Sequence, residues 1–296
     1  MIYPTFKSAQ KNYANRFKRA PEIHAQKWQG MDVSERPEAN MIELLHEDMR
    51  IAIRTEDLDV WREEIPANYP WADDHFNERV CGFPINPGKQ WAKWPWGNSA
   101  KAHLDLDGER FNHNYMERYW PKYAGVYNKP TYESEEFLMT TSGYKEPRDE
   151  SEKSRTLPMW AMDGARPKEG IRSKYADLND LVETLVREPD TRQAYLPIWF
   201  PEDGTVKGRK PCSLGYHFIL RHGYFHVTYY MRSCDFYRHW ADDCYLTVRL
   251  MLWILDRCRE KNPDVWNDVK PGFFNMHTTS LHMFINDAAT MGIERR

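Results

Sequence analysis

The chain has 296 residues, of which 41% are hydrophobic and 29% charged, and its formal net charge is −3. These values are typical of a globular protein with one large core, and they exclude the broad basic surface that sequence-independent nucleic-acid binding requires. No run of about 18 apolar residues occurs, so no membrane span is expected. The five cysteines form no CxxC pair, which argues against a disulfide framework or a structural zinc site and favours a reducing, cytoplasmic setting.

The first 130 residues are irregular in pattern and rich in Trp and Pro. Within them, Met41, Leu44, Leu45 and Met49 fall near one face of a helix, so their spacing predicts a helix over residues 37–53. A second, short helix is expected to end at Gly82, before a Pro-rich turn that carries three tryptophans.

The segment 131–172 is polar and charge-rich, which predicts an insertion or an exposed loop. The pattern sharpens after it. We expect a capped helix that stops at Pro189, a strand, two strands joined at His222-Gly223, a long buried helix and a last strand. These elements fall in residues 176–192, 193–204, 213–233, 241–260 and 277–287. Their order predicts an α+β fold.

Cys212 stands at the entrance to one of the predicted strands, just after Arg209 and Lys210. Nearby positive charge favours the thiolate, which is the reactive form of cysteine. In the predicted hairpin, Arg232 and Ser233 end the neighbouring strand, and such a pair suits a phosphate because both side chains donate to its oxygens. Spacing alone is equally compatible with a buried structural cysteine and an arginine that pairs with an acid at the next helix.

Several short motifs give this region a specific resemblance. Residues 177–287 resemble the thymidylate synthase family, which includes the phage pyrimidine-nucleotide hydroxymethylases. The matching segments, in the order of the family, are PDTR at 189–192, PC at 211–212, YMRSCD at 230–235 and SLHMF at 280–284.

The resemblance implies the fold of that family. We therefore expect a single domain over residues 1–296, with a mixed β-sheet that forms a dimer interface, flanking helices and a long buried helix. Residues 1–130 would be a divergent N-terminal part, 131–172 an insertion, and 173–296 the part with the catalytic motifs.

The same resemblance implies roles for individual residues. Cys212 would add to C6 of a pyrimidine nucleotide, so that C5 can attack 5,10-methylenetetrahydrofolate; this is covalent catalysis, and it needs no metal. Arg232 and Ser233 would hold the 5′-phosphate, and Arg192 would reach the same phosphate from the other subunit of a homodimer. His282 would lie near the sugar hydroxyl.

The folate and the water that the reaction needs have their own candidate residues. By resemblance, Asp235 would bind the pterin ring, and Trp91 and Trp94 would lie at the folate. A glutamate must also order water and shuttle protons. Glu78 is favoured because a glycine, an asparagine and these tryptophans follow it, as in the family, whereas Glu43 in MIELLHEDM is the alternative.

Asp243 is the most informative departure from the family, because thymidylate synthases carry an Asn at this place. An Asn amide matches the O4 acceptor and N3–H donor of uracil. Cytosine presents the reverse pattern, and an Asp can accept from its amino group and, if it shares a proton, donate to N3. The residue thus resembles that of deoxycytidylate hydroxymethylases, although acidic residues such as Asp242 and Asp243 also stabilise a helix N-terminus.

Two further departures concern the phosphate and the sugar. Gln193 replaces a second arginine of the family, and Phe284 replaces a tyrosine, so one phosphate contact and the preference for deoxyribose over ribose stay open.

The product depends on what reacts with the methylene at C5. Hydride from the folate gives methyl, whereas water gives hydroxymethyl. Only nine residues follow Asp287, so the tail that closes over the folate in thymidylate synthases is missing here or replaced by another segment, which favours water. The leading hypothesis is therefore a deoxycytidylate 5-hydroxymethyltransferase. The alternatives are a dUMP hydroxymethylase, a thymidylate synthase, and a non-catalytic nucleotide-binding protein.

Overall fold

A computed structural model describes residues 1–28, 31–97, 111, 113–123, 174–205 and 209–294. The predicted insertion at 131–172 lies outside these residues. Contacts divide the chain into two compact units. The first unit comprises Met1–Ala67, Thr184–Tyr195 and Cys212–Arg296, and the second comprises Asn68–Glu183 and Leu196–Pro211. Among the described helices, none has the length and apolar character that crossing a membrane requires.

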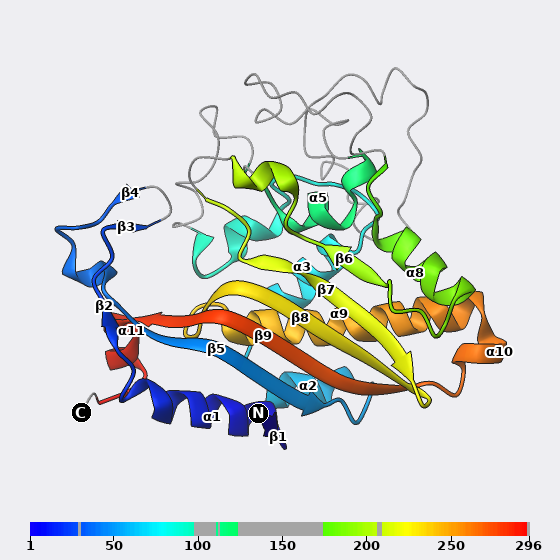
Figure 1. Ribbon diagram of the computed structural model, residues 1–296, viewed down its shortest axis with the longest axis horizontal. Helices are drawn as coiled ribbons and strands as arrows, with labels where there is room; N and C mark the ends of the chain where they lie inside the picture. The colour runs from blue at the N-terminus through cyan, green and yellow to red at the C-terminus, as the bar shows by residue number, and fades with distance from the viewer. Residues whose placement is uncertain (29–30, 98–110, 112, 124–173, 206–208, 295–296) are drawn as a thin grey trace. The chain divides into compact units, whose positions relative to one another are not determined.

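A mixed β-sheet forms the centre of the first unit (Figure 1). Its strands are β1 (Ile2–Tyr3), β2 (Glu22–Ile23), β5 (Met41–Ala52), β7 (Ser213–Arg221), β8 (Tyr224–Asp235) and β9 (Lys270–Phe284). The order along the sheet is β1-β5-β9-β8-β7, and β2 pairs with β5. β8 and β9 are parallel, whereas β7 with β8 and β5 with β9 are antiparallel. The predicted mixed sheet of an α+β fold is confirmed.

The hairpin between β7 and β8 follows from its two turn residues. His222 and Gly223 both have positive φ, 53° and 75°. Two consecutive residues of this kind make the tight turn whose twist matches that of antiparallel strands. The predicted hairpin is therefore confirmed, and it fixes the register that pairs Ser213 with Met231.

The helix predicted over residues 37–53 is wrong, because this segment forms the short turn η1 (Pro37–Ala39) and the long strand β5. The side chains of Ile42 and Leu44 point to the covered face, and those of Met49 and Ile51 do so after an interruption. The interruption is at His46, which has a φ of 55° and no partner in the ladder with β9. The register with β9 is the same on both sides of His46, but the buried positions change there from even to odd numbers, so the apolar spacing imitates that of a helix.

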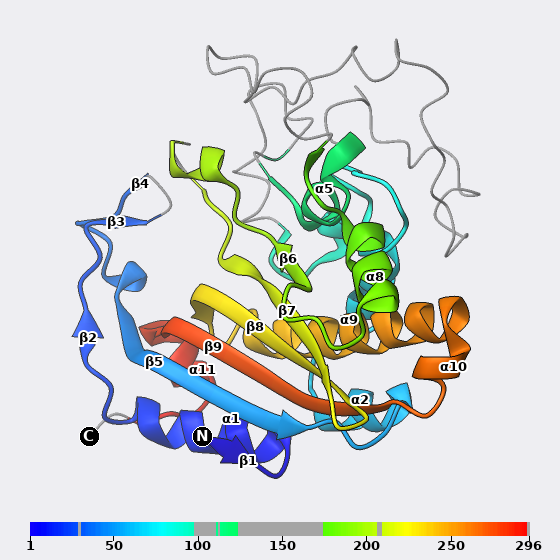
Figure 2. The same ribbon diagram turned by 45° about the vertical axis from the view of Figure 1, so that its right-hand side comes forward.

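Among the residues that the structure describes, the helices of the first unit cover one face of its sheet and leave the other face without a helix (Figures 1 and 2). They are α1 (Phe6–Phe17), α2 (Leu58–Glu64), α9 (Trp240–Lys261), α10 (Pro263–Trp266) and α11 (Ile285–Thr290). The long helix α9 is the predicted buried helix, and its residues Val248, Leu250 and Leu255 are fully buried. Aromatic rings join α1 to the start of α9, where Phe236 contacts Tyr13 at 5.9 Å and Trp240 at 5.4 Å between ring centroids.

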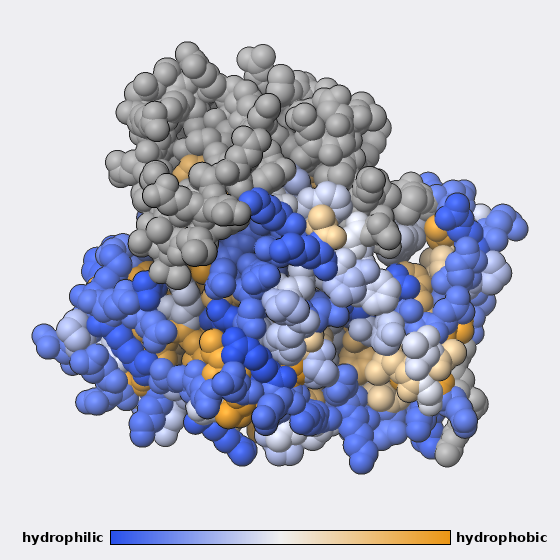
Figure 3. Space-filling view, turned by 180° about the vertical axis from the view of Figure 1, so that it is seen from behind, coloured by the Kyte–Doolittle hydropathy of each residue, from blue (hydrophilic) through white to orange (hydrophobic). Residues whose placement is uncertain are grey.

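The outer surface on the side of the helices is mostly hydrophilic. Figure 3 shows this side, with smaller hydrophobic areas between the charged residues. A separate two-stranded ribbon, β3 (Lys27–Trp28) with β4 (Met31–Asp32), completes the first unit, and Trp28 contacts Phe284 edge to face at 5.6 Å.

The second unit is built from short elements. They are α3 (Trp71–Arg79), η2 (Gln90–Lys93), α5 (Tyr115–Tyr119), η3 (Pro121–Tyr123) and η7 (Pro201–Gly204). A buried ion pair between Arg118 and Asp203, 2.8 Å apart, ties α5 to η7. The predicted short helix is confirmed as α3, which ends before Gly82 with its φ of 87°.

Two elements cross the boundary between the units. They are α8 (Leu178–Arg187) and β6 (Tyr195–Pro197). α8 is the helix, and β6 the strand, that the sequence predicts in this region. Asp177 and Asp180 cap the start of α8 reciprocally, since each carboxylate accepts from the backbone N–H of the other.

Candidate functional site

One end of the sheet gathers most of the residues with predicted roles. Cys212 precedes β7, and its carbonyl accepts the backbone N–H of Arg232 at 2.9 Å. Because β8 and β9 run parallel, their last residues lie side by side, and Asp235 is paired with His282. The pairing of the strands therefore brings Cys212 and His282, which are 70 positions apart in the chain, to the same edge of the sheet.

The thiol of Cys212 lies between two donors. Nη2 of Arg232 is 3.9 Å from the sulfur, and the Ser233 hydroxyl is 3.7 Å from it. The two donors also contact each other, at 3.3 Å from Nη1 to Oγ. Arg232 is exposed and Ser233 half-buried, so both can still donate to an anionic ligand beside the sulfur.

The other four cysteines are buried, and only Cys212 is partly accessible. Burial raises the pKa of Cys81 to about 12, and it raises the pKa values of Cys234 and Cys244 well above the ordinary range. Those three sulfurs are thiols at neutral pH. Accessibility therefore separates Cys212 from every other cysteine in the chain as a candidate nucleophile.

Asp243 lies in the first turn of α9 and faces the sheet. The hydroxyl of Tyr229 donates to Oδ1 at 3.5 Å, and the thiol of Cys234 lies 3.7 Å from Oδ2. Tyr229 also shares a short hydrogen bond with the hydroxyl of Ser213, the residue after Cys212. The candidate base reader is thus linked to the strand of the candidate nucleophile through buried hydroxyls.

A β-bulge shapes β7 next to Cys212. The register shifts between Ser213 and Gly215, so Ser213 stays opposite Met231 while Gly215 is opposite Tyr230. Bulges of this kind redirect side chains at the edges of sites.

Asp235 is almost fully buried at the end of β8. Its Oδ1 accepts the backbone N–H groups of Tyr237 and Arg238 at 3.1 and 3.0 Å. Burial raises the pKa of Asp235 to about 6, although these hydrogen bonds and the charge of Arg238 oppose the shift. Arg238 also binds Asp287 at 2.7 Å and lies 4.5 Å from the ring centre of Phe284.

His282 is paired with Asp235 on one side and with Glu43 of β5 on the other. The pKa of His282 is lowered to about 4, mainly by burial; the charges of Arg232 and Arg238 act in the same direction, and a hydrogen bond with the backbone of Ser280 opposes them. The ring is therefore neutral at neutral pH, with one donor and one acceptor nitrogen. The carboxylate of Glu43 accepts a short hydrogen bond from Ser280.

Arg192 is exposed in the segment between α8 and β6. Its carbonyl lies 3.0 Å from Nε2 of His217 on β7, which fixes the backbone at this point.

Glu78 is at the end of α3, in the second unit, with a side chain that is 2% exposed. Its Oε1 accepts the backbone N–H groups of Lys89 at 2.6 Å and Gln90 at 3.3 Å. Nε of Arg79 donates to Nε2 of His75, so Nδ1 of that ring carries the proton and donates to Oε2 of Glu78 at 3.2 Å. Three donors hold the carboxylate in one orientation.

Trp91 and Trp94 lie in the second unit as well, on or beside η2, and both are half-buried. The ring of Trp94 is 5.7 Å from that of Trp71, which in turn stacks on His75 at 4.7 Å. Trp91 contacts Phe111 edge to face at 5.4 Å. These half-buried flat surfaces suit an aromatic ring system as ligand.

The predicted residues thus fall into two sets. The first unit holds Cys212, Arg192, Arg232, Ser233, Asp235, Asp243 and His282, and the second holds Glu78, Trp91 and Trp94. Among the residues that the structure describes, no group of three or more His, Cys, Asp or Glu side chains is arranged to hold a metal ion.

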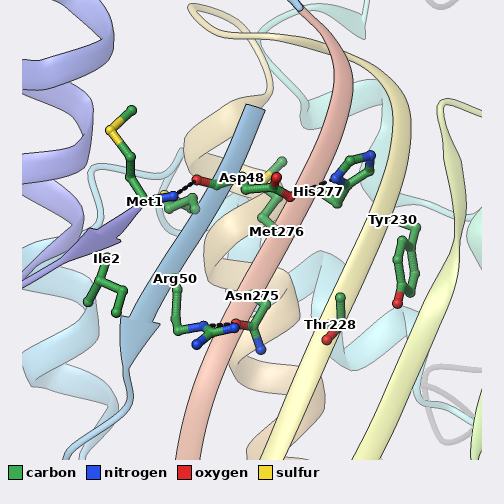
Figure 4. A pocket seen from close by; sticks show the side chains of 10 residues that line it. Met1, Ile2, Asp48, Arg50, Thr228, Tyr230, Asn275, Met276 and His277 are labelled. Carbon is green, nitrogen blue, oxygen red and sulfur yellow. Dashed lines mark hydrogen bonds and ion pairs between the residues drawn. The ribbon is translucent and has the colours of Figure 1, made fainter. Parts of the chain in front are cut away.

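A cavity of about 480 Å³ lies elsewhere, on the face of the sheet without helices (Figure 4). Polar side chains line much of it, including Asp48 with His277 at 2.6 Å and Arg50 with Asn275 at 2.7 Å. None of the predicted site residues lines this cavity.

Sequence reasoning missed two residues of the site, Ser213 and Tyr229. Tyr229 occupies an inward position of β8 between the apolar residues Val227 and Met231. A buried tyrosine in such a row needs a partner for its hydroxyl, and this was the available signal.

The chain also matches a known protein family. A family model described as thymidylate synthase matches residues 53–240. The matched segment includes Glu78, Cys212 and Asp235, and it excludes Glu43 and His282.

Two curated relatives match shorter segments. A protein of Methanosarcina barkeri (strain Fusaro / DSM 804), named "Putative thymidylate synthase", is 25% identical over 114 residues, which are 38% of this chain and 48% of the relative. The deoxyuridylate hydroxymethyltransferase of Bacillus phage SP01 is 32% identical over 118 residues, 37% of this chain and 27% of the relative. The matches thus span about half of one relative and about a quarter of the other.

Proposed function

The chain belongs to the thymidylate synthase family, and from this membership we propose that it transfers a one-carbon unit from 5,10-methylenetetrahydrofolate to C5 of a pyrimidine nucleotide. The observation that carries the proposal is the position of the Cys212 sulfur, 3.9 Å from a guanidinium nitrogen of Arg232 and 3.7 Å from the hydroxyl of Ser233. A nucleophile beside a phosphate grip is what attack on a nucleotide requires.

In this proposal, Cys212 adds as a thiolate to C6 of the pyrimidine, which makes C5 electron-rich. Arg232 and Ser233 bind the 5′-phosphate, and their contacts with the sulfur place the nucleotide beside it. His282 is neutral, so it can exchange a hydrogen bond with a sugar hydroxyl without attracting a second anion.

The folate is a co-substrate that supplies the one-carbon unit. Asp235 has a second carboxylate oxygen, 3.8 Å from Arg238, that can accept from the N–H groups of a pterin. Trp91 and Trp94 offer half-buried flat surfaces for stacking. The donor and ring chemistry of these residues fits such a ligand.

We assign the ordering of water and the proton transfers to Glu78. Three donors fix the direction of its carboxylate. Glu78 also lies inside the segment that matches the family model, whereas Glu43 lies outside it. Glu78→Gln should therefore lower turnover by about 10²-fold or more, and Glu43→Gln should have the smaller effect.

The proposed substrate is dCMP, and the proposed product is 5-hydroxymethyl-dCMP. A carboxylate oxygen of Asp243 can accept from the amino group of cytosine, and the contacts with Tyr229 and Cys234 orient this side chain. The phage relative is named a hydroxymethyltransferase, which supports a hydroxymethyl product. That name also supports the second candidate, a dUMP hydroxymethylase, because its substrate is deoxyuridylate.

The test of the substrate is turnover of dCMP and dUMP by the parent and by Asp243→Asn. We expect the parent to prefer dCMP and the variant to shift towards dUMP by about tenfold or more, because an amide can donate to O4. Turnover of dUMP alone, with no change in Asp243→Asn, would support the second candidate and contradict the base-reading role.

We further propose that the protein is a homodimer that pairs the sheet faces without helices. Large apolar side chains are exposed on strands of this sheet, among them Leu45 at 57%, Tyr224 at 48% and Phe273 at 37%. Exposed apolar area of this kind is typical of a protein–protein interface. Arg192 is exposed and would reach the phosphate site of the partner.

A further inference from the structure

A row of buried polar side chains lies behind the candidate base reader. Ser213, next to Cys212 in the chain, shares a short hydrogen bond with Tyr229, and Tyr229 contacts the Asp243 carboxylate. Ser213 and Tyr229 are both fully buried. A buried hydroxyl without a partner is costly, so neither group can leave this row without loss of stability.

The ring of Tyr229 is held in place by stacking. Tyr216 on the adjacent strand lies parallel to it, with 4.3 Å between centroids and 9° between planes. The ring therefore fixes the position of the Tyr229 hydroxyl, and the hydrogen bond with Ser213 restricts its orientation.

The direction of the hydrogen bonds follows from the chemistry of the last acceptor. Tyr229 donates its one hydroxyl proton to Oδ1 of Asp243, so Ser213 must donate to Tyr229. The thiol of Cys234 points at the other oxygen, 3.7 Å away.

We propose that Tyr229, supported by Ser213, is a positioning residue that sets the base preference of Asp243. The proposal rests on the proposed function, in which Asp243 reads the pyrimidine edge. A donor behind the carboxylate fixes the direction of its oxygens, so that one oxygen can accept from the cytosine amino group while the carboxyl group shares a proton with N3. Uracil presents the reverse pattern, an acceptor at O4 and a donor at N3, so the same orientation disfavours it. The Tyr229–Asp243 distance of 3.5 Å is long for a hydrogen bond, and such contacts shorten when substrate binds.

The test compares kcat and KM for dCMP and dUMP in the parent, Tyr229→Phe and Asp243→Asn. Tyr229→Phe keeps the stacked ring and removes only the hydroxyl. We expect the dCMP-to-dUMP ratio of kcat/KM to fall roughly tenfold or more, mainly through a higher KM for dCMP, since the contact is made to a charged group. In the Asp243→Asn background, Tyr229→Phe should change the ratio no further.

Tyr245→Phe is the matched control. Tyr245 is also a fully buried tyrosine, on α9, and its hydroxyl accepts from Arg249 at 3.5 Å. This variant should keep the parental ratio. Where Tyr229→Phe fails to fold, as judged by thermal melting, Ser213→Ala removes the donor behind Tyr229 and should lower the ratio in the same direction.

Three results would contradict the inference. They are an unchanged ratio in Tyr229→Phe, an equal loss for both nucleotides, or an additive effect in the double variant. If Asp243→Asn shifts the ratio while Tyr229→Phe does not, the inference fails and the proposed function stands. If Asp243→Asn leaves the ratio of the parent unchanged, or the parent does not turn over dCMP, the proposed function itself fails.

Discussion

Cys212 differs from the other four cysteines in accessibility and in the two donors beside its sulfur. We predict that Cys212→Ala lowers product formation by at least about a thousand-fold, because the variant loses the one accessible cysteine and with it the proposed bond to C6. Nucleotide binding, measured by calorimetry, should persist, since Arg232 and Ser233 remain.

Cys258→Ala is the control for this experiment, because Cys258 is a buried cysteine of α9. It should cost about 1 kcal/mol of stability and leave kcat unchanged. Turnover by Cys212→Ala close to that of Cys258→Ala would contradict the covalent mechanism and favour a different role for the fold.

Asp235 should make stability depend on pH. Its pKa is about 6 in the folded protein and about 3.8 in the unfolded chain, because burial disfavours the charge. Between these values the folded state binds the proton more than the unfolded state does. The free energy of unfolding should therefore fall as pH rises from about 4 to about 6, by on the order of 2 kcal/mol from this group.

The measurement is urea unfolding at pH 4 and at pH 6.5 for the parent and Asp235→Asn. An Asn oxygen can still accept the two backbone N–H groups of Tyr237 and Arg238, so the variant isolates the charge. We expect the variant to gain stability relative to the parent at the higher pH. A difference that is the same at both pH values would show that Asp235 does not titrate in this window.

At the scale of elements, the turn after α3 is built around Glu78. Gly88 has a φ of 75°, and a Cβ there would lie 2.6 Å from Cδ and Oε1 of Glu78. Gly88→Ala should destabilise the protein by about 1–3 kcal/mol and displace the carboxylate, which would also lower turnover. Unfolding in urea and kcat measure the two effects.

Gly223→Ala separates backbone strain from the clash. Gly223 also has a φ of 75°, but no atom lies within 4 Å of the position of its Cβ. This variant should lose about 1 kcal/mol and keep its kcat. Equal effects of both variants on kcat would remove the support that Gly88 gives to a role for Glu78.

Local patterns predicted those elements that depend on neighbours in the chain. His222-Gly223 sets the hairpin, Asp177 and Pro189 bound α8, and the apolar surface of α9 indicates its burial. β5 was missed because the alternation of buried side chains breaks at His46, whose φ is 55°, and the strand is completed by pairing with β9, which lies far away in the sequence.

The site was predictable to a similar extent. Arg232 and Ser233 reach Cys212 because the hairpin fixes the register, and the hairpin is local. The link from Ser213 through Tyr229 to Asp243 joins two strands and a helix, and no short-range pattern encodes it. Likewise, the donors of Glu78 at Lys89 and Gln90 come from a turn that only the folded chain brings near.

At the scale of the whole molecule, the proposed dimer makes a specific prediction about subunit exchange. Arg192→Ala and Cys212→Ala should each be nearly inactive alone. In a mixed dimer, one of the two sites combines an intact Cys212 with an intact Arg192 from the partner. After unfolding and refolding of an equal mixture, about a quarter of all sites should be active.

The control is the same mixture without refolding, which should stay inactive if dimers do not exchange. A double variant that carries both substitutions should never recover. Failure of the refolded mixture to gain activity would show that Arg192 does not act across an interface.

The proposed reaction ends with the addition of water to the methylene group on C5, and the proposed function depends most on this step. Its direct test is mass analysis of the nucleotide formed from dCMP and methylenetetrahydrofolate in water labelled with heavy oxygen. We predict 5-hydroxymethyl-dCMP that carries the labelled oxygen, with no dihydrofolate formed. A methylated nucleotide without the label, together with the absorbance change of dihydrofolate, would contradict it.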